Sequence, residues 1–420
     1  NRVGGFCMTH LQQIKAGGYR VFISKVKSLT DKALLLISGI LAIPCVLLIR
    51  SLKKIVLFRI GPIRTDRIGH FAADSGQQFA ANSLGIKRVV DLYWISEYIS
   101  NTHLEKMVRR NFLIFDFVRY LDYWNLLLPG GIHHVRLSSY TGSRDVSGVL
   151  QKTRENMRFL SCEESQAKEW MSNYGWKEGD PFVCILVRDS MYLKNNDLYK
   201  QGVNYDYHNY RDSNIDNYVE DMEWLANQGV WVFRMGREMH KPVSSAHSKI
   251  IDYAFCEKQS DLLDIWMFAN CNLCISTGSG PDMVSDIYRR PLLLVNLIPI
   301  VHMFSWSDAT HLPRNLVYRK TGKNLTFSEH LKHSYTRSED YSNAGIDIVE
   351  LSSIEILHAV QERFKNIFEG CADSNRNLEL NDIVWNIVLS DDKASELHGF
   401  IHKNSCIANS FLKNNPDWLK

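Results

Sequence analysis

The sequence has little net charge, an odd number of cysteines, and no G-x-G-x-x-G glycine motif after its first predicted strand. A net charge of +3 is too small to indicate a nucleic-acid partner. The nine cysteines lie mostly in apolar runs, which is typical of buried free thiols and not of a disulfide framework. Cys271 and Cys274 form a C-x-x-C without a second pair, so we interpret them as core residues. The missing glycine motif argues against a dehydrogenase.

The length and composition of the chain indicate a folded protein of two domains. The chain has 420 residues, 45% of them apolar and 23% charged. This length exceeds one ordinary hydrophobic core, so we expect two α/β domains with additional segments.

The N-terminal region combines a basic lead with an uncharged apolar run at 33–49, which Arg50, Lys53 and Lys54 follow. As a helix the run reaches about 25 Å, short of the roughly 30 Å hydrocarbon core of a bilayer. Pro44 is expected to kink it. Basic residues on both sides favour a hairpin or a shallow segment on an anionic leaflet. The alternatives are a buried core helix and a signal peptide, the latter disfavoured by the position of the run and by the lack of a cleavage site. The basic residues of the lead are Lys15, Arg20, Lys25, Lys27 and Lys32.

The next segment has the pattern of an α/β domain. The runs at 54–61 and 88–93 predict strands, the first ending in a glycine turn, and the stretches 71–84 and 112–128 predict helices. The loop after the first strand opens where α/β folds bind ligands, at the carboxyl ends of the strands. Its polar residues are therefore site candidates, although a solvated loop with a capping aspartate is the alternative. They are Arg64, Asp66, Arg67 and His70.

A second α/β domain is predicted after the turn at Gly179-Asp-Pro181. Strands are predicted at 182–188 and 230–236, each with an arginine near its carboxyl end, Arg188 and Arg234. Arginine suits phosphate because its planar guanidinium donates two parallel hydrogen bonds and stays charged. The long polar loop 192–211 between them is too aromatic to be disordered. Its last residues are further candidates: His208, Asn209, Tyr210 and Arg211.

A strand at 273–275 is followed by a small-residue turn at 276–280, a helix from Asp282 that stops before Pro291, and a second apolar strand at 292–295. This is a βαβ unit whose turn leaves backbone N–H groups at a helix N-terminus, a favourable place for a diphosphate. The alternative is an ordinary strand-to-helix turn, since short glycine motifs have many false positives. The candidates are Gly236 from the preceding strand and Ser276, Thr277, Gly278, Ser279, Gly280 and Asp282 from the turn.

Several of these motifs together resemble a family of bacterial glycosyltransferases found with surface-polysaccharide genes. The resemblance covers most of the chain. It rests on Arg67-Ile-Gly-His-Phe-Ala-Ala73, Val187-Arg-Asp, His208-Asn-Tyr-Arg-Asp-Ser-Asn-Ile-Asp-Asn-Tyr218, Arg234-Met-Gly236, Ile251-Asp-Tyr-Ala254 and Ser276-Thr-Gly-Ser-Gly-Pro-Asp282. The layout is similar to the GT-B type, in which two facing Rossmann-like domains bind the acceptor and a nucleotide-diphosphate sugar. That type requires no metal-binding Asp-x-Asp, and the sequence has none.

The resemblance and the residues together predict four regions. These are a basic lead with a membrane-associating segment (1–54), an acceptor domain (55–170), a nucleotide-sugar domain (171–369) and a helical tail packing across both domains (370–420). The predicted function is transfer of a sugar from a nucleotide-diphosphate donor to a glycan or glycolipid acceptor, without metal or cofactor, at the cytoplasmic face of the inner membrane. Two alternatives are a GT-B-like nucleotide-sugar epimerase and a non-catalytic membrane-bound partner of a glycan-assembly complex.

The predicted site divides into three groups. Donor binding is assigned to Arg188, Arg234, Gly236, the turn 276–280 and Asp282, and acceptor or loop contacts to Arg64, Arg67 and 208–211. If the enzyme inverts the anomeric centre, a base must take a proton from the acceptor. Asp66, expected to stay ionised between arginines, and His70, with an ordinary pKa near 6.5, are the candidates. Further candidates are Asp189 and His208 for the base, and Asp308, His311 and Arg314 for the donor pocket.

Overall fold

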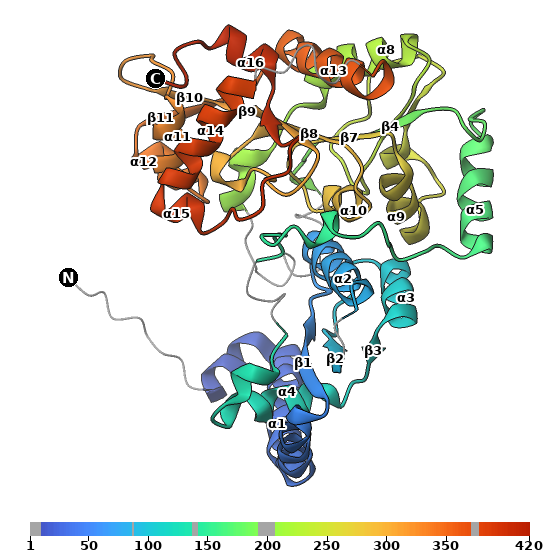
Figure 1. Cartoon of the computed structure of the whole chain (residues 1–420), viewed down its shortest axis with the longest axis vertical. Coiled ribbons are helices and arrows are strands. Elements are labelled where there is room, and N and C mark those ends of the chain that lie inside the picture. The colour runs from blue at the N-terminus through green and yellow to red at the C-terminus, as the bar shows by residue number, and fades with distance from the viewer. Residues whose placement is uncertain (1–9, 86–87, 137–141, 192–205, 371–377) are drawn as a thin grey trace. The chain divides into compact units, whose positions relative to one another are not determined.

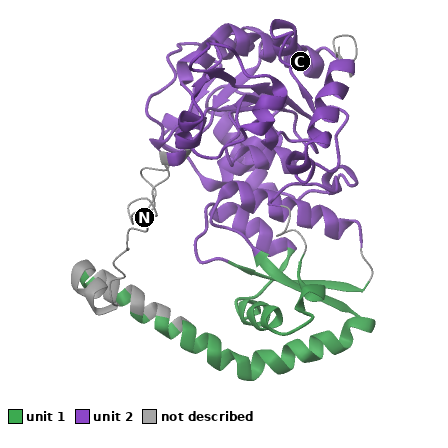
Figure 2. Ribbon diagram, turned by 90° about the vertical axis from the view of Figure 1, so that its left-hand side faces the viewer, with its two compact units in different colours: residues 1–62, 86–95, 112–136 green, residues 63–85, 96–111, 137–420 purple. Residues whose placement is uncertain are grey.

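The computed structural model describes residues 10–85, 88–136, 142–191, 206–370 and 378–420 (Figure 1). The chain forms two compact units, shown in different colours in Figure 2. Unit 1 comprises 1–62, 86–95 and 112–136, and unit 2 comprises 63–85, 96–111 and 137–420. The predicted boundary at 170/171 falls within unit 2, and parts of the predicted acceptor domain belong to each unit. The assignment of acceptor and donor domains stays a prediction.

Unit 1 is a small α/β unit with one long helix. Its sheet has the strand order β1-β2-β3, with β2 and β3 parallel. The elements are α1 (His10–Ser51), η1 (Leu52–Lys54), β1 (Leu57–Ile63), β2 (Val89–Ile95), β3 (Leu113–Ile114), α4 (Val118–Leu127) and η2 (Gly131–His134). The core contains Ala42 and Val46 of α1 together with Ile60, Val118 and Leu121.

Helix α1 continues through Pro44, which lies inside it. The helix runs on to Ser51, and its non-helical backbone angles are at Gly18. Pro44 lies on the exposed side of α1. The first strand also differs from the prediction, because β1 begins at Leu57 after the 3-10 turn η1. Lys53 and Lys54 thus belong to the helical end and not to the strand.

Unit 2 is built on a seven-stranded sheet with the order β12-β9-β8-β7-β4-β5-β6. Each neighbouring pair is parallel. Apart from the short added strand β12, the order is that of a doubly wound, Rossmann-like fold, with β4 in the place of the first strand. The strands are β4 (Phe182–Leu186), β5 (Trp231–Arg234), β6 (Ile250–Asp252), β7 (Leu273–Ser276), β8 (Leu292–Leu297), β9 (Ala309–Pro313) and β12 (Cys406–Ile407).

Helices cover both faces of this sheet (Figure 1). One side carries α8 (Val219–Asn227), α13 (Ser353–Phe368) and α16 (Asn409–Asn414), which contact one another through α13. The other side carries α9 (Asp261–Asn270) and α10 (Asp282–Ile287), against which α2 (Ile68–Ser83), α3 (Thr102–Asn111) and α5 (Ser161–Ser172) pack. Both faces being covered explains why the strands are almost continuously apolar.

The remaining elements of unit 2 lie around this framework. They are the antiparallel pair β10 (Asn315–Tyr318) and β11 (Ile346–Val349), the helices α11 (Phe327–Lys332), α12 (Ser338–Asn343), α14 (Leu378–Ser390) and α15 (Asp392–Ser395), and the 3-10 turns η4 (Val149–Gln151), η5 (Asp206–Arg211), η6 (Ile215–Tyr218), η7 (Tyr253–Phe255) and η8 (Ile300–His302). The tail residues Trp385, Phe411 and Trp418 join the main core of unit 2. Cys271 and Cys274 are buried, as predicted for core residues.

Candidate active site

A cavity of about 330 Å³ lies in unit 2 at the carboxyl ends of β4, β5 and β7. The strand order reverses between β4 and β7, so the cavity occupies the switch point at which doubly wound sheets bind ligands. The sheet and its loops contribute Leu186, Arg188, Asp189, Arg211, Met235, Gly236, Arg237, Met239, Ser279, Gly280 and Pro281, and the helices and their N-terminal loops contribute Asp66, Arg67, Ile68, Gly69, Ser100, Asn101, Asp264, Ile265, Phe268 and Val284.

Arg188 follows β4 and lines the cavity. Its backbone N–H donates to Thr277 Oγ1 at 2.8 Å, and its Nε donates to Asp212 Oδ1 at 3.1 Å. Its buried Nη2 has no hydrogen-bond partner within the described residues. Burial and the neighbouring Arg211 lower the pKa of Arg188. A buried, partly unpaired guanidinium at the edge of a cavity is well suited to an anionic ligand.

Arg211 and Arg67 add positive charge to the same cavity. Arg211 Nη2 donates to the carbonyl of Gly278, so the turn after β7 orients the guanidinium of Arg211. Arg67 is exposed at the start of α2. Neither arginine forms an ion pair with a carboxylate in the part of the chain that the structure describes.

The turn after β7 positions the arginines, and most of its predicted residues do not line the cavity. Ser276 Oγ donates to Asp282 Oδ2 at 2.8 Å, while Thr277 and Gly278 bind Arg188 and Arg211 as above. Of the six predicted residues here, Ser279 and Gly280 line the cavity. Burial raises the pKa of Asp282 to about 7. This carboxyl occupies the first position of a six-residue helix, α10, which corrects the expectation of an open anion site at that terminus.

The sixteen-residue helix α2 instead begins at the cavity, through Ile68 and Gly69. Its N-cap residue, Arg67, makes no capping hydrogen bond, and its first turn has no acidic residue. The helix starts very close to the turn, since a Cβ at Gly69 would lie 2.9 Å from Gly280 Cα. The first amides of α2 thus combine with three arginines to favour an anion in this cavity.

The two candidate bases, Asp66 and His70, differ in their position relative to the cavity. Asp66 lines the cavity and pairs with Arg64 at 3.3 Å, both partly exposed. His70 is half-buried within α2, outside the cavity lining, and its Nδ1 lies 2.7 Å from Ser143 Oγ. Ser143 Oγ in turn donates to Asp74 Oδ1 at 2.6 Å. With Asp74 ionised, Ser143 must accept from His70 Nδ1–H, which leaves the lone pair on Nε2.

Ser143 is held in place by further contacts. Gln77 Nε2 donates to its backbone carbonyl at 3.1 Å, and its φ of +68° lies in the left-handed region. Burial raises the pKa of Asp74 to about 6. Burial, followed by the charges of Arg64 and Arg67, lowers the pKa of His70. His70 is therefore neutral at pH 7, with its tautomer set by a chain that the sequence did not reveal.

Arg234 does not line this cavity. It is the last residue of β5 and pairs with Asp252, its register partner on β6, at 3.0 Å. It lines a second cavity of about 170 Å³ with Asp212 and Lys241. Because a neighbouring strand supplies its carboxylate partner, Arg234 is turned away from the place that the sequence suggested.

The other predicted residues are distributed as follows. Gly236 lines the cavity, whereas Asn209 is exposed and Tyr210 is buried. The side chain of His208 lies outside the described residues. Three residues make structural contacts: Asp308 pairs with Arg363, His311 Nδ1 contacts the carbonyl of Cys406, and Arg314 pairs with Glu350. Asp189 lines the cavity and accepts from the amides of Met191 and His240.

The sequence analysis missed Arg237, Asp264, Ser100 and Asn101, which also line the cavity. Arg237 pairs with Asp264 and Asp261. Asn101 Oδ1 accepts from the amide of Leu104 and so caps α3. Arg237 follows the predicted strand 230–236 by one residue, so its position was a usable signal, whereas 100–101 carry none.

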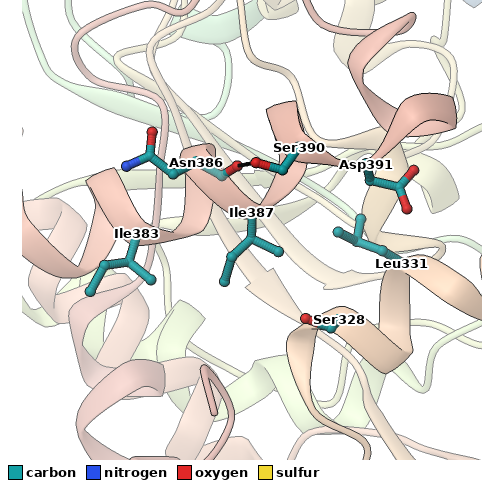
Figure 3. Close-up of a pocket in the computed structure, with 7 residues that line it drawn as sticks. All are labelled: Ser328, Leu331, Ile383, Asn386, Ile387, Ser390 and Asp391. Carbon is teal, nitrogen blue, oxygen red and sulfur yellow. Dashed lines mark hydrogen bonds between the residues drawn. The ribbon is translucent and has the colours of Figure 1, made fainter.

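A larger hollow of about 460 Å³ lies elsewhere in unit 2, between α11 and α14 (Figure 3). It is lined by aliphatic and neutral polar side chains and by Asp391. Ser390 Oγ donates to the Asn386 carbonyl at 2.7 Å, and Asp391 caps α15. Among the described residues, its lining contains no cation to hold a phosphate.

Comparisons with known proteins found similarity among solved structures. No family model matches the chain, and no curated protein matches it. The ADP-heptose LPS heptosyltransferase II of E. coli is 10% identical with a TM-score of 0.36, over 61% of this chain and 90% of that one. A family 9 glycosyl transferase of Veillonella parvula is 12% identical with a TM-score of 0.36, over 61% and 86%. The E. coli heptosyltransferase WaaC with ADP is 10% identical with a TM-score of 0.30, over 57% and 87%. These three structures are of bacterial glycosyltransferases.

Proposed function

We propose that the protein is a glycosyltransferase that moves a sugar from a nucleotide-diphosphate donor to a glycan or glycolipid acceptor. The observation that carries this proposal is the cavity at the switch point of the parallel sheet, which Arg188, Arg211 and Arg67 line and at which Arg188 has a buried guanidinium nitrogen without a partner among the described residues. Such a cavity is suited to a diphosphate.

The chemistry needs a stabilised leaving group. Departure of the sugar leaves a nucleoside diphosphate whose negative charge grows in the transition state. Arg188, Arg211 and the first amides of α2 supply positive charge and hydrogen-bond donors for it. Transfer then does not require a metal ion. Met235, Met239 and Ile265 give the same cavity an apolar side for the nucleoside.

An inverting reaction also needs a base for the acceptor hydroxyl. Asp66 lies at the cavity and can receive the proton directly. His70, two residues beyond the cavity-lining Ile68, is the second candidate, because its contact with Ser143 through Nδ1 leaves the lone pair on Nε2. Asp66 is preferred because it is the one that reaches the cavity.

We place the protein at the cytoplasmic face of the inner membrane, in assembly of a bacterial surface glycan. The support is the apolar stretch of α1, since Lys32–Lys54 is long and apolar enough to cross a membrane by length and composition. A lipid-linked acceptor is consistent with that location.

The test is release of nucleoside diphosphate from a panel of nucleotide sugars, with and without a bacterial membrane-lipid extract, in the presence of EDTA. We expect release that depends on the extract, together with a sugar-modified lipid seen by mass spectrometry. Conversion of the donor to an isomeric nucleotide sugar would instead show an epimerase. Donor binding without turnover would show a non-catalytic partner.

A further inference from the structure

The apolar stretch of α1 has two different faces within unit 1. One face packs inward, with Ala42 and Val46 in the core. Trp124 of α4 packs over Gly39, where a Cβ would lie 2.6 Å from its ring, and its Nε1 donates to the Leu35 carbonyl at 3.2 Å. These positions recur every three or four residues, so they form a stripe along one side of the helix.

The opposite face is exposed although it is just as apolar. Ile40 and Leu41 are 74% and 76% exposed. The exposed side chains of this face are Leu34, Leu36, Ile37, Ile40, Leu41, Leu47 and Leu48. Such a continuous aliphatic surface is unusual in water and marks an interaction site.

A second segment extends this surface at the end of α1. Arg50 Nη2 donates to the carbonyls of Asn125 and Leu128, at 2.8 and 3.2 Å, and so fixes the end of α4 beside α1. The side chains that flank these contacts, Leu126, Leu127 and Ile132, are 57–58% exposed. The apolar surface is therefore built from two segments that are far apart in the sequence. Arg50 and Asn125, which join them, are separated by 75 positions.

Charge identifies the partner. The first 65 residues carry eleven lysines and arginines and one acid, Asp31, a net charge of +10. Since the whole chain has +3, the remainder carries 3 − 10 = −7. Lys32, Lys53 and Lys54 flank the apolar surface and are exposed. Aliphatic side chains bordered by cations fit a leaflet of anionic lipid.

The packed stripe decides between crossing and lying in the membrane. A spanning helix needs about 20 residues surrounded by lipid. Here the stretch from Gly39 to Arg50 keeps one side on α4 and the sheet of unit 1. We propose that α1 lies in the plane of one leaflet, with its exposed face and the side chains of Leu126, Leu127 and Ile132 inserted and its packed face remaining on unit 1. This inference does not depend on the proposed enzymatic function.

The first experiment measures flotation of the full chain with vesicles of phosphatidylethanolamine and phosphatidylglycerol. Ile40→Asp with Leu48→Asp should lower binding by roughly tenfold or more per substitution, because each removes an inserted aliphatic group. Leu126→Asp with Leu127→Asp should also lower it, which α1 acting alone would not explain. The matched control is Ile354→Asp with Leu389→Asp, exposed aliphatic residues of unit 2, which should bind like the parent.

The second experiment separates insertion from crossing. Cysteines are placed singly at Lys32 and Lys53, in a chain whose other accessible cysteines are serine, and vesicle-bound protein is treated with a membrane-impermeant maleimide. Both positions should react if the helix lies in the outer leaflet. Protection of one of them shows a spanning helix and overturns the proposal.

Other occupants of this surface give distinct results. If the α1 substitutions leave vesicle binding unchanged and convert a dimer to a monomer in sedimentation, the surface is an interface between copies and the lipid proposal is wrong. Circular dichroism and thermal unfolding, measured on the same variants, report whether each is folded.

Discussion

Replacing Arg188 by methionine tests whether the cavity in unit 2 binds the donor phosphates. Methionine keeps most of the side-chain length and removes the charge. Arg188 has one carboxylate partner, Asp212, and one buried nitrogen without a partner among the described residues. A charge-assisted hydrogen bond to phosphate contributes about 1.5 to 3 kcal/mol. We therefore expect the Kd for nucleoside diphosphate to rise roughly 10- to 150-fold.

Arg234→Met is the matched control, because the sequence placed both arginines at strand ends. The side chain of Arg234 is 2% exposed and pairs with Asp252 away from the cavity. Its loss should destabilise the fold by about 3 kcal/mol, since Asp252 is left without its cation. Arg188→Met should destabilise less, because its carboxylate partner Asp212 is 26% exposed and Asp252 only 17%.

Both variants are measured by calorimetric titration with the nucleoside diphosphate and by thermal unfolding without ligand. We expect Arg188→Met to lose affinity with a small change in Tm, and Arg234→Met to lose Tm with affinity within about twofold of the parent. Equal affinities for Arg188→Met and the parent, or an equal loss for both variants, would refute the assignment of the cavity.

Three further predictions concern the acidic groups and His70. Asp66→Asn should lower turnover roughly 100-fold or more with donor affinity unchanged, whereas His70→Gln should do so only if His70 is the base; normal turnover in both places the base elsewhere. Ser143→Ala removes the partner of His70 Nδ1, so the pKa of His70 in an NMR titration should change, and an unchanged titration would contradict the chain that ends at Asp74. Asp282 has a pKa raised to about 7, so between pH 4 and 7 the folded protein binds more protons at this carboxyl than the unfolded chain does. The destabilisation of the fold by the buried carboxylate therefore grows over that range and is complete above it. Asp282→Asn should therefore raise the free energy of unfolding at pH 8 by an amount on the order of 4 kcal/mol and have little effect below pH 4. Equal effects at both pH values would contradict this prediction.

The sheet of unit 2 was predictable because its strands are buried on both faces. The apolar runs at 182–188, 273–275 and 292–295 correspond to β4, β7 and β8. Cavity-lining Arg188 and Gly280 were found for the same reason, since loops after parallel strands meet at one edge of the sheet.

Side-chain direction was not predictable from position along a strand. Arg234 ends β5, but its direction is set by Asp252 on the neighbouring strand, 18 residues later. Ser276 and Asp282 form a hydrogen bond with each other across the turn. The sequence motif alone, which suggested an open phosphate-binding loop, does not reveal this bond. The contact between Ser143 and Asp74 joins residues 69 positions apart, for which the sequence has no signal.

The apolar run at 33–49 was recognised from its composition, but its geometry was not. Composition alone does not distinguish a spanning helix, a shallow helix and a core helix. The structure adds that Gly39 lies against Trp124, a close contact that makes one side of α1 part of unit 1.

The most direct test of the central claim is calorimetric titration of the full chain with ADP, UDP, GDP, CDP and TDP in the presence of EDTA. The account predicts that at least one of them binds with a Kd below about 1 mM and that Arg188→Met weakens this binding at least about tenfold. If none binds at millimolar concentration while the protein remains folded, the donor site and the proposed glycosyl transfer are both contradicted.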